Sequence, residues 1–198
     1  MSGAFPISNA KFSTMGIKSI QNTIISKSDS GKKLARQIDG QRFAFTAEII
    51  TAKRSDVYGE LMAFIMKQRS QKETFQISLP DLKNAKGNVS GSVLVKNAHT
   101  AGDTTITVDA MTGTLKAGDF VKFAGDTKVY MVVSDVTADG SNEATLTIEP
   151  PLRSAISDNA SVTYDGVEFT VRLTNDLQQF STDDLDTFRF EVDFIEAF

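Results

Sequence analysis

The feature that most constrains the fold is a run of short β-prone segments between residues 88 and 164. Six such segments follow one another with Gly- and Asp-containing turns between them, and none shows a helical period. A small closed or nearly closed barrel suits them better than an open sheet, because closure removes unpaired edges. Gly125-Asp126 suits a type II′ turn and Asp139-Gly140 a type I′ or bulged turn, since both need positive φ.

Longer alternating segments flank this run on both sides. Residues 42–51 and 188–194 place aromatic and aliphatic side chains at every second position, which predicts strands with one buried face. Residues 17–25 and, more weakly, 32–38 also predict strands. The polar stretch of residues 1–16 predicts a loose N-terminal arm.

One segment changes to a helical period. An apolar stripe on residues 56–69 consists of Val57, Leu61, Phe64 and Ile65, with charged residues outside it. We expect this helix to lie across the sheet that the neighbouring strands form, because no other part of the chain offers so much apolar surface.

The C-terminal strands have no room for a core of their own, so we expect them to complete the sheet begun near the N-terminus. The predicted fold is mainly β. A β-sandwich with one helix is formed by residues 17–87 and 166–198, and a small OB-like β-barrel is inserted at residues 88–165. Insertion at a loop is tolerated when the ends of the inserted segment lie close together.

Composition excludes several classes of function. The 198 residues carry a net charge of −4 with a pI near 5.1, which argues against a protein that grips phosphate backbones. The absence of cysteine rules out disulfides, thiolate metal sites and cysteine nucleophiles. No apolar run approaches the ~20 residues of a membrane span, and no secretory signal is visible. We therefore expect folding in the cytoplasm and no membrane insertion.

Residues with catalytic or metal-binding potential are few. His99 lies in a polar turn without a Cys partner or an HExxH neighbourhood, and is predicted to be an ordinary exposed loop residue. Residues 135–146 imitate a calcium loop but end in Leu where the closing Glu is needed. An acidic loop cluster, of a kind that usually faces water, consists of Asp183, Asp184 and Asp186. The chain is predicted to be no enzyme and to hold no cofactor or metal.

Aromatic and basic residues alternate within the predicted barrel. Phe120, Phe123 and Tyr130 lie near Lys122 and Lys128, a pattern found in barrels that bind single-stranded nucleic acid. The same positions are equally explained as barrel core, which is the interpretation we favour. A stand-alone barrel protein that binds carbohydrate or nucleic acid stays as one alternative.

The order of the elements carries a family resemblance, through the stretches QRFAFTAEII, LMAFIMKQRSQKETFQISLPD, TTITVDAMTGTLKAGDFVKFAGDTKVYMVVSDVTADG, EATLTIEPPL, GVEFTVRLTND and FRFEVDFIEAF. The chain resembles a bacteriophage distal tail protein of the subtype with an inserted OB-like barrel. The most specific piece, residues 113–153, also looks like insertions in other phage structural proteins. A head or neck component of the same kind of virion is therefore a second alternative.

The resemblance implies a structural protein of the virion tail, assembled in the host cytoplasm. Six copies would form a ring at the distal end of the tail, joining the tail tube to the baseplate hub or tip. The barrel would project outward, where it supports tail fibres in some relatives. DNA would pass through the ring without specific binding, and the resemblance implies no catalytic residues.

Acidic residues are candidates for the wall of that channel or for the contact between subunits, because a channel lined with carboxylates repels DNA. Strand alternation places Glu191 and Asp193 on one face, opposite the Phe side chains. The full candidate set is Glu48, Asp183, Asp184, Glu191 and Asp193. An unrecognised hydrolase is the third alternative, which the single His and the missing motifs disfavour.

Overall fold

The chain folds into two compact units, which we call the frame and the barrel unit. The computed structural model describes residues 3–6, 11–51, 59–178, 180–182 and 188–198. The frame comprises Met1–Phe75 and Val171–Ala197, and the barrel unit comprises Gln76–Thr170 with Phe198. The predicted fold class is confirmed: the chain is mostly β, with 48% strand, one helix in the described residues and a nearly closed barrel-like sheet.

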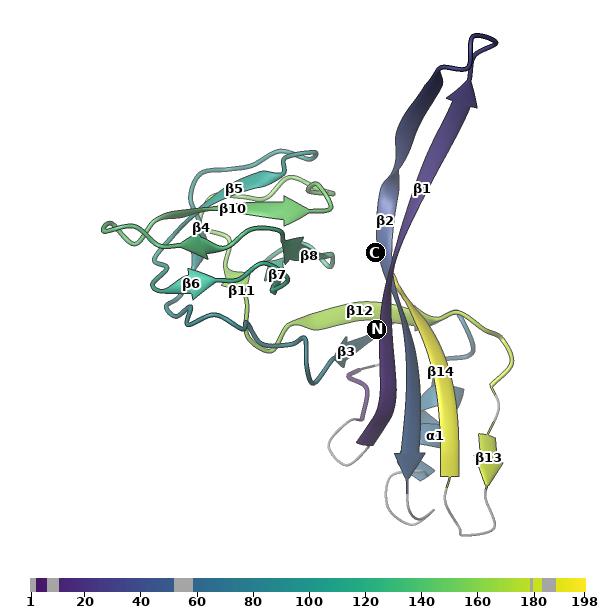
Figure 1. Cartoon of the computed structure of the whole chain (residues 1–198). Helices are drawn as coiled ribbons and strands as arrows, with labels where there is room; N and C mark the ends of the chain where they lie inside the picture. The colour runs from purple at the N-terminus through teal and green to yellow at the C-terminus, as the bar shows by residue number, and fades with distance from the viewer. Residues whose placement is uncertain (1–2, 7–10, 52–58, 179, 183–187) are drawn as a thin grey trace. The chain divides into compact units, whose positions relative to one another are not determined.

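A six-stranded sheet brings together strands from both ends of the chain (Figure 1). Its order is β1-β2-β14-β12-β3, and β13 pairs with β14 outside this path. The strands are β1 (Lys11–Lys27), β2 (Lys33–Thr51), β3 (Phe75–Ser78), β12 (Glu168–Leu173), β13 (Phe180–Thr182) and β14 (Phe188–Glu196). The long-range pair β2–β14 is antiparallel and lies at the centre of this order.

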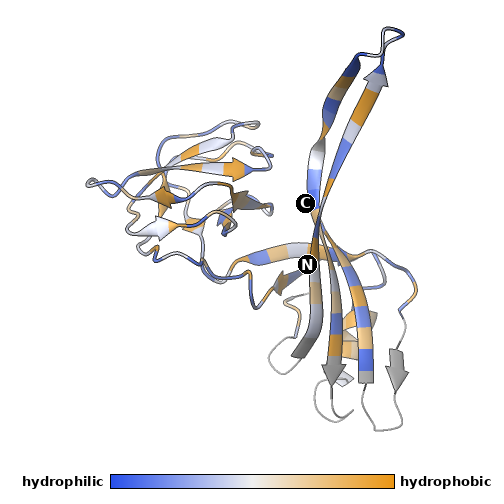
Figure 2. Cartoon of the chain, in the orientation of Figure 1, coloured by the Kyte–Doolittle hydropathy of each residue, from blue (hydrophilic) through white to orange (hydrophobic). Residues whose placement is uncertain are grey.

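Alternation places the apolar side chains of β2 and β14 in the core, as the period-2 pattern predicts. Phe45, Ala47 and Ile49 are buried on β2, and they pair in register with the buried Phe194, Val192 and Phe190 of β14. Figure 2 shows the resulting alternation of hydrophobic and hydrophilic residues along β14. The core face of the sheet is therefore set by matched apolar pairs across the two strands.

The helix α1 (Gly59–Lys67) contributes the buried Leu61 and Ile65 to the frame. It contacts the sheet through aromatic rings: the Phe64 ring meets the Phe75 ring edge-on at 5.2 Å between centroids. Phe75 in turn lies 5.7 Å from Phe194 on β14. The predicted helix is confirmed over residues 59–67, and the predicted first turn with Val57 lies outside the described residues.

The N-terminal arm is predicted wrongly where the structure describes it. Residues 11–16 belong to β1 and pair with β2, and Phe5 is buried against Phe64 at 5.5 Å between ring centroids. The polar side chains that suggested a loose arm are tolerated in β1 because it is the edge strand of the sheet. Pairing partners, which a single segment does not reveal, decide its conformation.

The two strands predicted at residues 32–38 and 42–51 are one continuous strand, β2. Extra residues on β2 around Gly40, with φ of 115°, are absorbed by a register shift between Ile20 and Asn22 of β1. Pairing of β14 with β2 stops at Ala44. Beyond that point β1 and β2 form a two-stranded hairpin that extends away from the other strands (Figure 1).

The barrel unit contains a second six-stranded sheet, in the order β11-β7-β8-β10-β5-β4. Its strands are β4 (Leu94–Val95), β5 (Thr105–Asp109), β7 (Phe120–Phe123), β8 (Val129–Val132), β10 (Ala144–Glu149) and β11 (Val162–Thr163). The terminal strands meet, because Val95 N donates to Ala160 O and Val162 N to Val93 O, both at 2.9 Å. A separate ribbon pairs β6 (Thr114–Leu115) with β9 (Val136–Thr137).

The two predicted turns differ in detail from the expectation. Asp126 N donates to Phe123 O at 3.1 Å, which puts Gly125, with φ of 88°, third in the turn. That geometry is type II and not the predicted type II′. In the second turn the positive φ of 62° belongs to Asn142 and not to Gly140, so the bulged alternative is the observed one.

The chain enters and leaves the barrel through two segments that are hydrogen-bonded to each other. Val167 N donates to Lys83 O at 2.8 Å, and Ala85 N donates to Tyr164 O at 3.1 Å. The boundaries between the compact units fall at 75/76 and 170/171, outside the predicted boundaries at 87/88 and 165/166. The predicted division at 87/88 and 165/166 stays a prediction, and along the sequence the barrel unit lies between the two parts of the frame.

The aromatic contact between helix and sheet generates a stability prediction. Phe75 is fully buried, and truncation of a buried Phe costs about 3–5 kcal/mol. We expect Phe75→Ala to lower the free energy of unfolding of the frame by about that amount in chemical denaturation. Met66→Ala, at an exposed position of α1, should change the free energy of unfolding by less than about 0.5 kcal/mol. Equal effects of the two substitutions would contradict the packing of Phe75 between α1 and the sheet.

The paired connections generate a second prediction. Replacing residues 86–163 by a short Gly/Ser linker joins Ala85 to Tyr164, which already lie within hydrogen-bonding distance. We expect the shortened chain to remain soluble and to unfold cooperatively, because the frame keeps all its strand pairs. Circular dichroism during thermal unfolding measures this, and loss of a cooperative transition would show that the frame needs the barrel unit to fold.

Candidate assembly surface

The outer face of the frame sheet carries a concentration of carboxylates. Glu48 on β2 lies directly opposite Glu191 on β14, and Asp193 lies opposite Thr46. These residues alternate with the buried Ala47, Ile49, Val192 and Phe194, so the same pattern that builds the core projects the acids outward. We call the surface formed by Glu48, Asp176, Glu191 and Asp193 the acidic face.

Few cations balance these charges. The guanidinium of Arg189 lies 4.0 Å from the carboxylate of Glu48, at the outer limit of an ion pair. Asp193 accepts hydrogen bonds from the hydroxyl of Thr46 at 2.8 Å and from the side-chain amide of Asn175 at 3.3 Å. Glu48 and Glu191 are thus like charges in a directly opposed cross-strand pair, an arrangement that is unfavourable in isolation.

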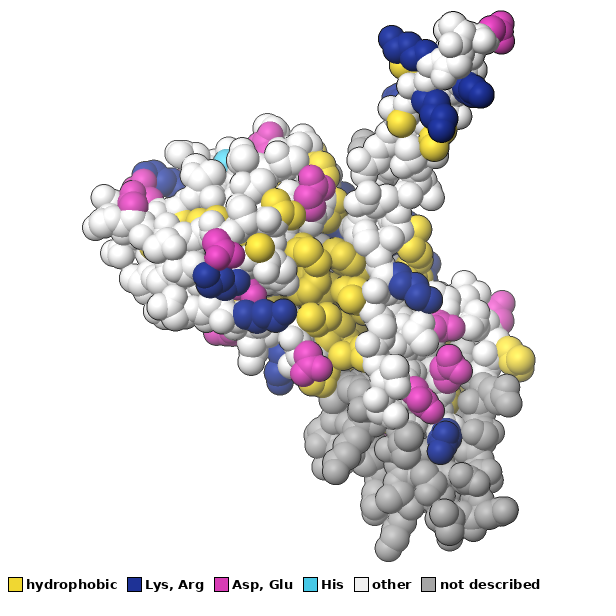
Figure 3. All heavy atoms as spheres, viewed as in Figure 1, with side chains coloured by type: hydrophobic (Ala, Val, Ile, Leu, Met, Phe, Trp, Pro, Cys, Tyr) yellow, Lys and Arg dark blue, Asp and Glu magenta, His cyan; other side chains and the backbone are white. Residues whose placement is uncertain are grey.

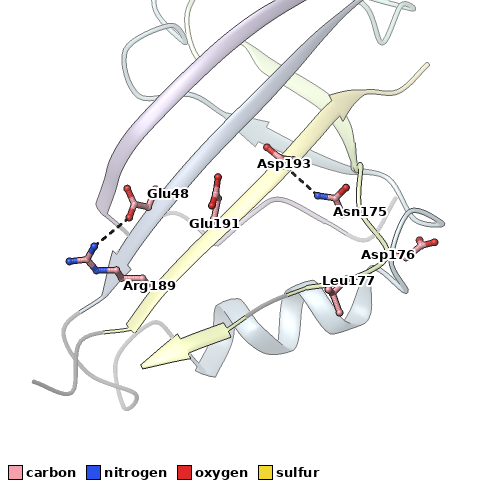
Figure 4. A pocket seen from close by; sticks show the side chains of 7 residues that line it. All are labelled: Glu48, Asn175, Asp176, Leu177, Arg189, Glu191 and Asp193. Atoms are coloured by element: carbon pink, nitrogen blue, oxygen red, sulfur yellow. Dashed lines mark hydrogen bonds and ion pairs between the residues drawn. The ribbon is translucent and has the colours of Figure 1, made fainter. Parts of the chain in front are cut away.

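An open groove of about 750 Å³ runs along the acidic face (Figure 4). The loop after β12 forms one side of it and supplies Asn175, Asp176 and Leu177. The side chain of Leu177 is 82% exposed, the highest exposure of any large hydrophobic residue described. A second groove, lined by Thr14, Gly16 and Lys18 of β1, shares Glu48 and Glu191 with the first. The arrangement suits the docking of a cationic partner with some apolar surface.

The predicted candidate residues divide into two groups. Glu48, Glu191 and Asp193 come together on the acidic face, although β2 and β14 are far apart in the sequence. Asp183 and Asp184 lie outside the described residues. The sequence reasoning missed Asp176, Leu177 and Arg189; strand alternation places Arg189 on the face of Glu191, whereas the loop pair Asp176 and Leu177 gives no signal in one sequence.

His99 is less exposed than predicted, with a side chain 14% exposed. Its Nε2 accepts a hydrogen bond from Thr107 N at 3.1 Å, and its Nδ1 lies 3.5 Å from a carboxylate oxygen of Asp103. Every one of these contacts is to a neighbouring turn or strand of the barrel unit. The residue therefore has a local structural role in holding the turn of residues 97–103.

A buried polar cluster holds one end of the barrel unit together. The side chain of Asp126 is only 1% exposed and accepts hydrogen bonds from the hydroxyls of Tyr130 and Ser154, at 2.8 and 3.0 Å. Arg153 pairs with the same carboxylate at 2.9 Å. Burial acts to raise the pKa of Asp126, but the hydrogen bonds from Lys128 N, Tyr130 and Arg153 outweigh it and hold the pKa below its usual value.

The aromatic residues that suggested a ligand-binding barrel are core residues, as the favoured interpretation predicts. Phe123 and Tyr130 are fully buried and belong to the main hydrophobic cluster of the unit. Phe120 packs edge-on against Phe169 at 5.4 Å between ring centroids. Their rings are therefore not available to stack on bases or sugars.

Neither a metal-binding cluster nor a membrane-spanning helix is present among the residues that the structure describes. No group of three or more His, Cys, Asp and Glu side chains is arranged to hold a metal ion there. No helix in the same ranges is long and apolar enough to cross a membrane.

Comparison with known proteins connects the barrel unit to a family. Residues 83–167 match the family described as Distal tail protein pb9, B domain. The match confirms the resemblance to a bacteriophage distal tail protein. The matched residues lie within the barrel unit and include the chain segments through which it is entered and left. A distal tail protein has a structural role in the phage tail and is a component of the virion tail. No curated protein matches the chain.

The Asp126 cluster generates a pH prediction for the barrel unit. A carboxylate with a depressed pKa stabilises the folded state above its unfolded pKa of about 3.9, and that contribution is lost as pH falls through the folded pKa. We expect Asp126→Asn to destabilise the barrel unit at pH 7 by about 1–3 kcal/mol and to flatten its further loss of stability below about pH 4.

Amide hydrogen exchange in β7 and β8 between pH 2.5 and 7 measures this effect. Asp135→Asn is the matched control, because Asp135 pairs with Lys116 on the exposed surface. A change as large in the control as in Asp126→Asn would show that the buried position is unimportant.

Proposed function

We propose that this distal tail protein forms a homo-hexameric ring at the distal end of the phage tail, where it links the tail tube to the baseplate hub or tip. The observation that carries the proposal is the match of residues 83–167 to a distal tail protein domain. The frame forms the ring in this proposal, and the barrel unit lies at its outside, available to tail fibres or other tip components.

The architecture of the frame supports a ring-forming role. Its sheet has an open edge at β1 and a hairpin that extends beyond its other strands, and both features offer surface to neighbouring subunits. The barrel unit, in contrast, joins its terminal strands to each other. The open edge at β1 is therefore a candidate for strand pairing between subunits.

Charge supports the passage of DNA without specific binding. The chain has a net charge of −4, and carboxylates dominate the described outer face of the frame sheet. A negative wall repels the DNA phosphates and prevents the trapping of DNA in the channel. The acidic face lies either on that wall or at the contact between subunits.

The competing functions receive less support. The burial of Phe120, Phe123 and Tyr130 removes the aromatic surface on which a nucleic-acid- or carbohydrate-binding role was considered. The head or neck alternative rested on the wider occurrence of residues 113–153 in phage structural proteins. The family match names a distal tail protein, which favours the tail over the head.

Electron microscopy of intact phage particles tests the proposal. We expect density for this chain in a ring of six copies at the tip of the tail, with the barrel units on the outside. Antibody labelling of the barrel unit in the same particles gives an independent position. A ring of another copy number, or labelling of the head, would contradict the proposal, whereas a basic channel wall would contradict only the charge argument.

A further inference from the structure

The hairpin beyond Ala44 lacks the support that the rest of the frame sheet has. No third strand pairs with it in the described residues, because β14 ends its pairing with β2 at Ala44. An isolated two-stranded hairpin is only marginally stable in water. Large apolar side chains are nevertheless exposed along it: Ile20, Ile24, Ile25, Leu34 and Ile38. Such a surface indicates an association site.

The charge of this hairpin is opposite to that of the chain as a whole. Residues 19–43 contain five basic and two acidic residues, a net charge of +3 against −4 for the whole chain. Figure 3 shows Lys and Arg side chains gathered near the end of the hairpin, beside exposed hydrophobic side chains. The sheet at the other end of the same strands carries the acidic face.

Strand register brings two of the basic side chains together on one face of the hairpin. Lys27 pairs directly with Lys33, and Ile25 pairs with Ala35; all four residues share one face of the two-stranded ribbon. Two lysines in direct opposition repel each other. Among the described residues, no carboxylate lies within ion-pair distance of either lysine. The ribbon therefore presents a cationic pair and an exposed isoleucine together.

The acidic face presents the complement of this arrangement. Glu48 and Glu191 are directly opposed across β2 and β14, and the exposed Leu177 lines the same groove. Arg189 and the neighbouring Lys18 reduce its negative charge but do not cancel the four carboxylates. A like-charged pair on each surface is unfavourable alone, and contact between the two surfaces would relieve both repulsions.

The two surfaces cannot meet within one chain. Lys33 and Glu48 lie on the same continuous strand, β2, and a separation of fifteen residues in a strand spans roughly 45–50 Å. The partner of the hairpin must therefore be another molecule. A second copy of this chain offers the required charge and the required apolar residue in one groove.

We propose that the hairpin of one copy, through Ile25, Lys27 and Lys33, docks on the acidic face of the next copy. The contact joins two different surfaces, so it propagates from copy to copy and closes into a ring when the rotation permits. It makes Glu48 and Glu191 part of the contact between subunits and not of the channel wall. The inference rests on the proposed ring and specifies how its subunits are joined.

A reciprocal charge swap tests this contact. Lys27→Glu/Lys33→Glu gives a copy with two anionic surfaces, and Glu48→Lys/Glu191→Lys gives a copy with two cationic surfaces. We expect each variant alone to associate roughly 10- to 100-fold more weakly than the native chain, as measured by sedimentation velocity and mass photometry. An equimolar mixture of the two should associate again, because each hairpin then meets a face of opposite charge.

Controls separate the specific contact from a general effect of net charge. Lys67→Glu/Lys72→Glu changes the net charge by the same amount on exposed residues of the frame outside the hairpin, and should leave association unchanged. Circular dichroism checks that each variant remains folded. Equal weakening by this control, or no rescue in the mixture, would overturn the proposal.

A crosslinking measurement covers the case in which association of the native chain is too weak to detect. The chain has no cysteine, so Lys33→Cys with Glu48→Cys introduces a single pair that is too far apart to close within one molecule. Oxidation should give a concentration-dependent series of disulfide-linked oligomers. The pair Lys72→Cys with Glu48→Cys is the control, and equal crosslinking of the two pairs would overturn the proposal.

The outcomes distinguish this inference from the proposed function. If six copies are found at the tail tip but the charge swap does not weaken association, the proposed ring is supported and the proposed hairpin contact is contradicted. If the mixed variants associate again but the antibody labels the phage head, the hairpin contact is supported and the assignment to the distal tail is contradicted.

Discussion

The antiparallel pairing of β2 with β14 is the interaction on which the rest of the structure depends. It joins residues 44–51 to residues 188–195 and so brings the two separate parts of the frame into one sheet. The main-chain N of Phe43 also donates at 3.1 Å to the side chain of Glu196, which is fully buried. Because the two strands present matched apolar residues on one side and carboxylates on the other, this pairing creates both the core of the frame and the acidic face.

Patterns within short stretches of the sequence predicted those elements whose conformation depends mainly on neighbouring residues. Period-2 alternation identified the strands containing Phe45 and Phe194, and a helical period identified the segment that became α1. The closely spaced Gly- and Asp-containing turns of residues 88–164 identified the barrel. Segments whose conformation depends on distant partners were predicted less well: polar residues 11–16 became part of an edge strand, and the interruption near Gly40 concealed a continuous β2.

The same distinction holds for the candidate surface. Alternation was sufficient to predict that Glu191 and Asp193 share a face, but only the strand register shows that Glu48 lies directly opposite Glu191. The groove wall formed by Asp176 and Leu177 depends on how a loop lies beside the sheet. The cationic hairpin was overlooked because its isoleucines fit a buried strand, and exposure of such residues cannot be deduced from their type alone.

The order of these elements along the chain also has a consequence for biosynthesis. The ribosome releases β1 and β2 first, then the whole barrel unit, and only afterwards β14. Domains tend to fold as units in the order of their synthesis, so the barrel unit can fold while β2 still waits for its central partner. The acidic face, which needs β14 beside β2, is therefore completed only after β14 has emerged, whereas both strands of the cationic hairpin emerge early. Until β14 arrives, the edge of β2 that it will cover is open to pairing with another chain.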